Sequence, residues 1–181
     1  MPTINDPNGT PAGVTSEGKL KTYSVIETES LHVNEDEGQM YAVMVDVTTG
    51  TTDDDFFYLQ NTDDNDLVVT KIEGWCDDAN QEISVYVGAT DAGTAAGDAL
   101  TPANMNAGSG NSADCVCTQD ATDLAITGGR VVSLLKFPTT ALEREEFLFN
   151  GGIILPKNQR LHMQASLAGL INLNIYFYYH D

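Results

Sequence analysis

Clusters of acidic residues are the part of the sequence best suited, by residue type, to bind a metal ion. Calcium takes about six to eight oxygen ligands, many of them carboxylates gathered by one loop. The clusters match neither an EF-hand loop nor a glycine–aspartate nonapeptide repeat, and each falls where strands should turn. We therefore interpret them as solvated acids that cap turns, with a weak calcium site at 53–55 or 63–66 as the alternative. The clusters are Glu35–Glu37, Asp53–Asp55, Asp63–Asp66 and Asp77–Asp78.

Cysteine and histidine are the other residue types that bind metals. The chain has three cysteines, Cys76, Cys115 and Cys117, and on a strand the last two would point to the same face. A zinc site needs about four cysteine or histidine ligands at suitable spacing. The three histidines fall in no such pattern: His32, His162 and His180. We expect buried or half-buried thiols, no disulfide framework, no metal and no cofactor.

Patterns for nucleophilic catalysis are missing from the sequence. The chain has no G-x-S-x-G nucleophile elbow and no histidine with a convincing serine or cysteine partner. The His-x-His pair of a metal-binding cupin is also missing. Gly128–Gly129 precede a strand pattern, whereas a phosphate-binding loop precedes a helix. We therefore expect a protein that is not an enzyme, with a metal-dependent enzyme as the least supported alternative.

The charge of the chain is strongly acidic and unevenly distributed. Its 27 Asp and Glu residues outnumber 8 Lys and Arg, which gives a formal net charge of −19. Nucleic acids and anionic membranes attract clustered bases, so neither partner is expected. Lys71 is the single base between residues 22 and 129, whereas residues 130–181 hold five bases and four acids. This asymmetry favours docking through the mildly basic C-terminal part, with solubility alone as the other interpretation.

The N-terminal residues predict an extended arm followed by one domain over 23–181. Residues 1–22 hold Pro2, Pro7 and Pro11 and few apolar residues, which is typical of a tail or of an arm that orders against a neighbouring subunit. They lack the basic and apolar regions of a secretory signal. No run reaches the roughly 20 apolar residues of a membrane helix. We expect a soluble protein made in a cytoplasm.

Alternation of apolar and polar residues predicts an all-β fold. The clearest runs are 41–48 and 171–179, where every second residue is apolar, as expected for antiparallel strands with one face in the core. A hairpin is predicted at 151–166, and one short helix at 139–146. The segment 88–129 predicts a surface excursion with short strands near 115–118 and 124–127. Further strands are predicted at 56–59, 67–75, 83–87, 131–137 and 147–149.

These strands favour an antiparallel β-sandwich with a jelly roll as the leading topology. An immunoglobulin-like sandwich is the alternative, although the sequence lacks the Cys–Trp–Cys spacing of that fold. Tyr176 and Tyr178 fall on the outward side of the last strand and predict an interface, because tyrosine suits contact surfaces. Lys19, Lys21 and Arg160 are the bases expected to join it.

One part of the sequence resembles a known family. Gly18–Val25, His32–Asn34 and Phe57–Val69, within the first 75 residues, resemble the opening of small jelly-roll virion proteins of tailed bacteriophages. Members of this family decorate or stabilise the phage head and often form trimers. The resemblance implies a homotrimer on the outer surface of the head, bound to the major capsid protein. The alternative is a tail or fibre module that recognises a host glycan through Trp75, the last strand and the 88–129 segment.

Overall fold

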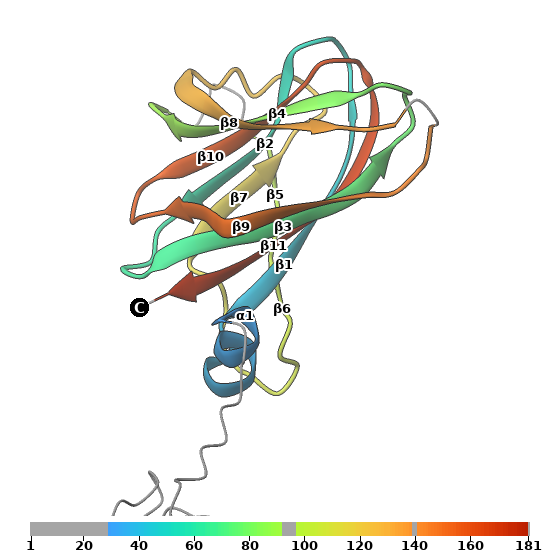
Figure 1. The fold of residues 1–181 in the computed structure, drawn as a ribbon. Helices are drawn as coiled ribbons and strands as arrows, with labels where there is room; N and C mark the ends of the chain where they lie inside the picture. The colour runs from blue at the N-terminus through green and yellow to red at the C-terminus, as the bar shows by residue number, and fades with distance from the viewer. Residues whose placement is uncertain (1–28, 92–96, 139–140, 181) are drawn as a thin grey trace, which may run out of the picture.

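The computed structural model describes residues 29–91, 97–138 and 141–180, which form two antiparallel β-sheets packed face to face (Figure 1). The strand order is β6-β1-β11-β3-β9 in the first sheet and β5-β7-β2-β10-β4-β8 in the second. The predicted β-sandwich is therefore confirmed. The first sheet contains β1 (Met40–Thr49), β3 (Asp66–Cys76), β6 (Ala103–Asn104), β9 (Glu145–Leu155) and β11 (Gly169–His180). The second contains β2 (Asp54–Asn61), β4 (Glu82–Ala89), β5 (Asp98–Ala99), β7 (Cys115–Gln119), β8 (Gly128–Lys136) and β10 (Arg160–Ala165).

Strand β11 forms the centre of the first sheet. It pairs with β1 on one side, where Leu173 lies opposite Val45, and with β3 on the other, where Ile175 lies opposite Ile72. The predicted alternation of β11 is confirmed: every second residue points into the core and is at most 2% exposed. These side chains are Ile171, Leu173, Ile175, Phe177 and Tyr179. Inward side chains of β2 and β10 in the second sheet complete the same core.

The chain crosses between the sheets after β9, so the predicted hairpin at 151–166 is wrong. Leu155 ends β9 opposite Leu67 in the first sheet, whereas Leu161 on β10 pairs with Leu59 in the second. The turn between them is held to the end of β2 by the amide of Asn158, which donates to the Asn61 carbonyl at 2.8 Å. The apolar pattern identified both strands but not their partners.

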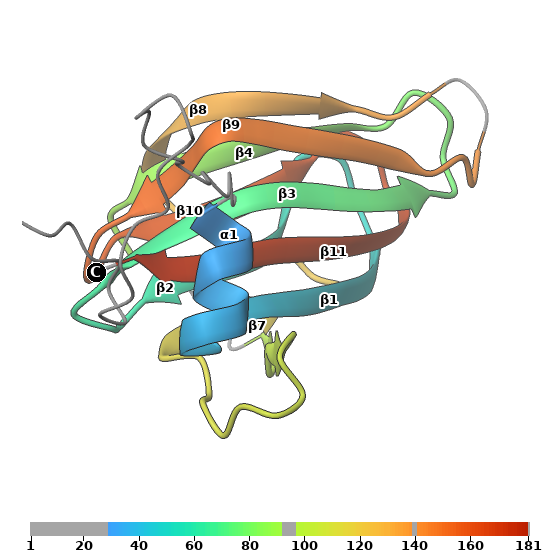
Figure 2. The ribbon, with the colours of Figure 1, turned by 60° about the horizontal axis from the view of Figure 1, so that its bottom comes forward.

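Three local features differ from the sequence predictions. In the described part of the predicted helix, residues 141–142 form a turn with Leu142 at φ 66°, and β9 begins at Glu145. Residues 124–127 form no strand: the Leu124 amide donates to the Asp55 carbonyl of β2 at 2.9 Å, but the next amide on that side, Ile126, bonds the Asp55 side chain and no ladder continues. An unpredicted helical segment, α1 (Glu29–His32) and η1 (Val33–Glu37), precedes β1 (Figure 2). The arm, 1–22, lies outside the described residues.

Helices in the described ranges are short: none is long and apolar enough to cross a membrane. Segment η1 covers part of the first sheet, because its Val33 packs on Val68 and Tyr178 at one end of that sheet.

Gly74 lets β3 and β11 approach each other in the first sheet. A Cβ at this position would lie 2.0 Å from the Asn172 carbonyl oxygen, which is backbone and cannot move freely. We expect Gly74→Ala to lower the free energy of unfolding by about 2–3 kcal/mol, as in other overpacked cores. Gly50→Ala is the matched control, since its nearest neighbour would be 3.7 Å away. Urea denaturation with equal midpoints for the two variants would contradict this role of Gly74.

Candidate functional site

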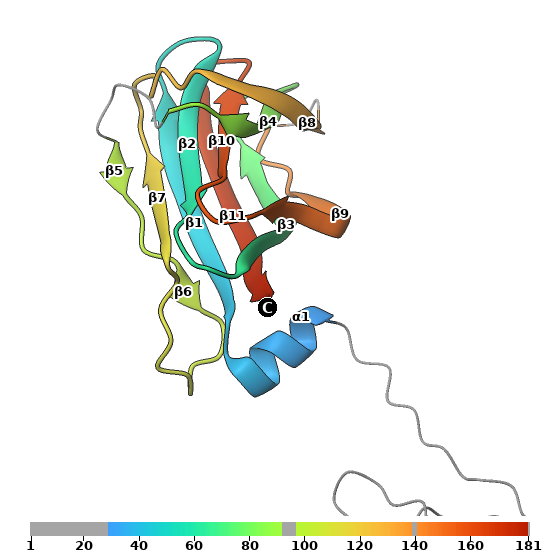
Figure 3. The ribbon, with the colours of Figure 1, turned by 90° about the vertical axis from the view of Figure 1, so that its left-hand side faces the viewer.

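Strands β8 and β9 are the outer strands on one side of the sandwich and carry a large share of the exposed apolar surface (Figure 3). We call residues 128–136 and 145–155 the β8–β9 flank. Leu148 is 64% exposed and Ile154 is 54% exposed. Half of the ten large apolar side chains exposed in the described residues lie on the flank: Val131, Val132, Leu134, Leu148 and Ile154. Leu148 and Ile154 lie on the outer face of the first sheet, opposite Lys71 and Val68, and Leu134 lies on the outer face of the second, opposite Ser84. Exposed apolar side chains along edge strands are typical of interaction sites.

The flank is also balanced in charge, unlike the rest of the chain. Its two strands and the segment that joins them hold three bases, Arg130, Lys136 and Arg144, and three acids, Glu143, Glu145 and Glu146. With a net charge of −19 on the whole chain, most other faces repel a second acidic protein. The flank can therefore approach an acidic partner, or another copy of this chain, without that repulsion.

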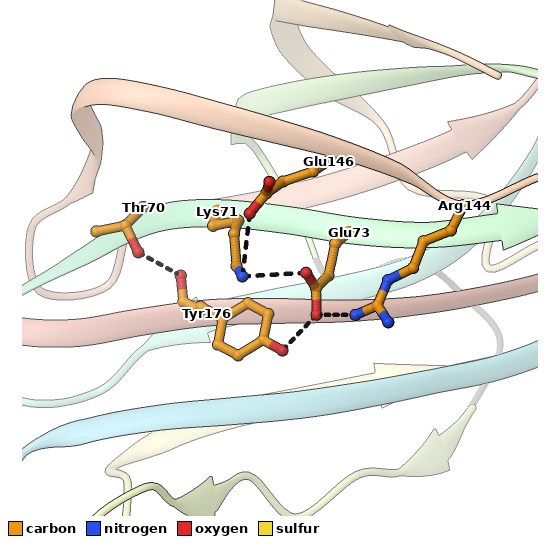
Figure 4. Close-up of polar contacts among 6 residues, drawn as sticks. All are labelled: Thr70, Lys71, Glu73, Arg144, Glu146 and Tyr176. Carbon is orange, nitrogen blue, oxygen red and sulfur yellow. Dashed lines mark hydrogen bonds and ion pairs between the residues drawn. The ribbon is translucent and has the colours of Figure 1, made fainter.

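A polar cluster centred on Glu73 borders the flank on the outer face of the first sheet (Figure 4). Glu73 is 7% exposed, and its carboxylate accepts hydrogen bonds from the Tyr176 hydroxyl at 2.6 Å and from Lys71 Nζ at 3.0 Å. Arg144 also pairs with Glu73, and Lys71 Nζ lies 4.2 Å from the centre of the Tyr176 ring. The Tyr176 bond and the two cations hold the pKa of Glu73 below its usual value. The cluster keeps Tyr176 and the start of β9 in fixed positions.

The structure separates the five residues predicted to form an interface. Tyr176 lies in the Glu73 cluster and is half-buried. Tyr178 is on the same face but only 9% exposed beneath Val33, which leaves little of its side chain for a partner. Arg160 lies on the other sheet, where it donates to the Ala89 carbonyl at 3.2 Å. Lys19 and Lys21 lie outside the described residues.

The acidic clusters do cap turns, but some of their members are buried. Asp54 is 3% exposed and accepts from the amides of Gly50 and Thr51 at 3.0 and 2.9 Å. Asp63 accepts from the Asn65 amide at 2.9 Å, and Asp77 from the Leu170 amide at 2.6 Å. The expectation that all are solvated is therefore wrong for Asp54 and its neighbour Asp55. Across the described ranges, no group of three or more His, Cys, Asp or Glu side chains is placed to hold a metal ion.

The three cysteines are free thiols, as predicted from the sequence. Cys76 and Cys117 are buried, and Cys115 is half-buried on the same inward face of β7. Burial raises the pKa of Cys76 to about 12 and that of Cys115 to about 11. These thiols are protonated at neutral pH and act as small core side chains.

A buried pair of ionisable groups, Asp55 and His162, lies on the outer face of the second sheet. His162 Nε2 is 3.6 Å from Asp55 Oδ1, and neither that oxygen nor His162 Nδ1 has a hydrogen-bond partner. The other Asp55 oxygen accepts from the Ile126 amide at 3.0 Å. The His162 ring stacks on Tyr86 with centroids 4.5 Å apart. The pair attaches the 124–126 segment to the sheet.

Burial shifts the two pKa values of this pair in opposite directions. It raises the pKa of Asp55 to about 6 and lowers that of His162 to about 4. Both shifts oppose ionisation, so at neutral pH His162 is uncharged. The pair provides no general base with access to solvent, because the side chains of Asp55 and His162 are 6% and 3% exposed.

Comparisons with known proteins add no relative: the chain matches no protein-family model, no curated protein and no solved structure. Its function must therefore be inferred from its own sequence and geometry.

The Asp55–His162 pair predicts a measurable pH dependence of stability. As pH falls from about 6.5 to 4, the unfolded chain protonates His162 and the folded chain does not, so His162 lowers stability. Asp55 acts in the opposite sense below pH of about 6, because the folded chain takes up its proton first. We expect His162→Gln to gain about 1–2 kcal/mol relative to the native chain between pH 7 and 4.5.

The matched variant is Asp55→Asn, which should lose stability relative to the native chain over the same pH range. Urea denaturation at closely spaced pH values measures both. Curves that run parallel to the native curve in both variants would show that the pair does not titrate as described.

Proposed function

We propose that this protein is a non-enzymatic structural protein of a bacteriophage particle, which decorates and stabilises the outer surface of the head. Its strand order supports a jelly roll. The eight longest strands form two four-stranded sets, β1-β11-β3-β9 and β2-β10-β4-β8. The first of these strands in the chain pairs with the last, and the second pairs with the last but one. This nested order is typical of jelly rolls, which recur in viral capsid domains. The resemblance of the first 75 residues to phage virion proteins points the same way.

The β8–β9 flank is the observation that carries the proposal. Edge strands of isolated proteins are usually short, charged or covered, because a bare edge invites pairing with another chain. At the opposite side of the sandwich the outer strands β5 and β6 have only two residues each, whereas β8 has nine and β9 eleven. A long, apolar and neutral edge suits a subunit that is covered in an assembly. We propose that it joins copies of this chain in a homotrimer.

The charge of the chain supports an exterior position. A surface with net charge −19 is repelled by packaged DNA, which is itself a dense polyanion. On the outside of a head, the acidic turns would face solvent and help to keep particles apart. The same proposal includes the major capsid protein as the partner that holds the trimer in place.

Labelling of particles tests the proposed location. An antibody raised against the purified chain should decorate the outside of intact particles in immunogold electron microscopy, and the chain should be present in the proteins of purified particles. Particles that lack the chain, or that are labelled only after disruption, would overturn the proposal.

Substitution on the flank tests the proposed self-association. Leu134→Glu with Leu148→Glu places one charge on the outer face of each edge strand, and we expect the trimer to dissociate at least about tenfold more readily, a change of about 1.4 kcal/mol. Both side chains are more than 40% exposed in the single chain, so the melting of the monomer should change little. Sedimentation equilibrium measures the association.

The control for this experiment is Met44→Glu, an equally apolar residue that is 61% exposed on β1, away from the flank. It should leave the trimer intact. A native chain that is monomeric at all concentrations, or a Met44→Glu variant that dissociates equally, would refute the role of the flank without bearing on the labelling of particles.

A further inference from the structure

Strand β9 has an open edge along its whole length. It pairs with β3 over 145–155 and with no other strand of the described residues. The amide and carbonyl groups on its other edge can therefore receive a further strand. The ion pair of 3.3 Å between Lys71 and Glu146 fixes the start of β9, so this edge is formed before a partner arrives.

The symmetry of a trimer requires a second surface that fits the flank. Neighbours around a threefold axis make heterologous contacts, in which one patch of a copy meets a different patch of the next copy. Two flanks that face each other would give a twofold dimer instead. The homotrimer proposed above therefore needs a complementary segment of one copy to cover the flank of the next.

Residues 19–28 have the composition of such a segment. They read KLKTYSVIET, in which half of the ten residues are β-branched or aromatic and none is proline or glycine. The eighteen residues before them hold three prolines and three glycines. An extended chain rises about 3.3 Å per residue, so ten residues span about 33 Å. That length nearly matches the eleven residues of β9.

The first described residues place the end of this segment beside the flank. Val33 of η1 packs on Val68 of β3, and Val68 pairs with Ile154 near the end of β9. From there the chain crosses the outer face of the first sheet and enters β1 at Met40, beyond β11 (Figure 2). Helix α1 therefore begins on the side of the sheet that holds β9 (Figure 3).

The charges of the segment and of β9 are complementary. Lys19 and Lys21 are at the N-terminal end of the segment, and Glu143 and Glu145 are at the start of β9. Neither of these two glutamates pairs with a base in the described part of the chain. The opposite charges meet when residues 19–28 run parallel to β9, so that the lysines lie level with its start.

Cyclic symmetry favours the same direction. Around an axis that runs along the strands, the ends of the three β9 strands lie at one level. Since α1 begins near the end of β9 in each copy, residue 28 of one copy is level with the end of β9 in the next. Ten extended residues that lead up to that point begin near Glu145, at the other end of β9.

We propose that residues 19–28 of one copy add a parallel strand to the open edge of β9 in the next copy, which rests on the homotrimer proposed above. Main-chain hydrogen bonds along the edge hold the added strand, as in other cases of β-strand addition. Its two lysines contact the acids at the start of β9. Its apolar residues cover Leu148 and Ile154, which are exposed in the single chain.

A disulfide cross-link between full-length chains tests this contact. One preparation carries Ser24→Cys, and a second, lengthened by a tag, carries Asn150→Cys at an exposed position in the middle of β9. Both positions lie midway along their elements, so a parallel pairing places them side by side. After subunit exchange and mild oxidation, we expect a linked pair of one short and one long chain on a non-reducing gel.

The matched control replaces Asn150→Cys with Met44→Cys, which is 61% exposed on β1, away from the flank. It should give no such pair, and neither should the native chain, whose thiols are buried or half-buried. The contact is overturned if Asn150→Cys links no more than Met44→Cys does. It is also overturned if a chain with both Ser24→Cys and Asn150→Cys links only within itself, because β9 would then be covered by its own chain.

Reversal of the charges is the second test. Lys19→Glu with Lys21→Glu should make the trimer dissociate about tenfold more readily in sedimentation equilibrium, because four glutamates then face each other. Adding Glu143→Lys with Glu145→Lys should restore the trimer, since each pair again has opposite charges. Failure of this second change to restore it would contradict the proposed direction of the strand.

The control for the reversal adds Asp46→Lys with Asp98→Lys instead, two exposed acids on β1 and β5. This chain has the same net charge as the restored one but should stay dissociated. A native trimer without the cross-link overturns the role of residues 19–28 alone. A native chain that is monomeric or dimeric overturns the homotrimer together with this contact, and the labelling of particles is a separate result.

Discussion

The pairing of the last strand with the first is the interaction on which the rest of the structure depends. Strand β11 lies between β1 and β3, and its inward side chains are in contact with both sheets. Met40 pairs with Tyr178 and Thr49 with Gly169, so most of the described chain lies between the two partners. Closing so large a loop costs entropy, which is offset only when apolar residues such as Phe177 enter the core. The sandwich therefore cannot be complete until its C-terminal strand is in place.

This constraint explains why the two sides of the sandwich differ. Strands β1, β11 and β3 occupy the middle of the first sheet and are held from both sides. Strands β8 and β9 have one sheet neighbour each, β4 and β3, and leave their other edges open. The rigid Glu73 cluster reaches from β3 and β11 to Glu146 at the start of β9, where Lys71 Nζ lies 3.3 Å from the Glu146 carboxylate. One outer strand is thus fixed to the stable centre while its apolar side chains stay exposed.

The sequence patterns predicted local structure well and long-range pairing poorly. Alternating residues identified β1 and β11, because period two depends on nothing beyond the strand itself. The same reasoning predicted a hairpin at 151–166, because strands that are neighbours in the sequence often pair. Alternation alone does not show whether the next strand lies in the same sheet or in the opposite sheet. Tyr176 was recognised as an outward residue. Its partner Glu73, and the Arg144 that pairs with Glu73, were missed. They come together only through the register of β3 with β11 and through a turn that was expected to be helical.

The acidic composition of the chain serves the fold as well as the surface. Asp54, Asp55 and Glu73 are all less than 9% exposed. Asp54 accepts hydrogen bonds from turn amides, Asp55 from the Ile126 amide, and Glu73 from the Tyr176 hydroxyl, so donors that would otherwise lack a partner are satisfied. Part of the negative charge is thus held in place by local donors, which limits its cost to folding. Between molecules there is no such compensation, because exposed carboxylates of two copies repel each other. Close contact between copies is then least costly where acids and bases are balanced, and in the described residues that balance coincides with the apolar β8–β9 flank.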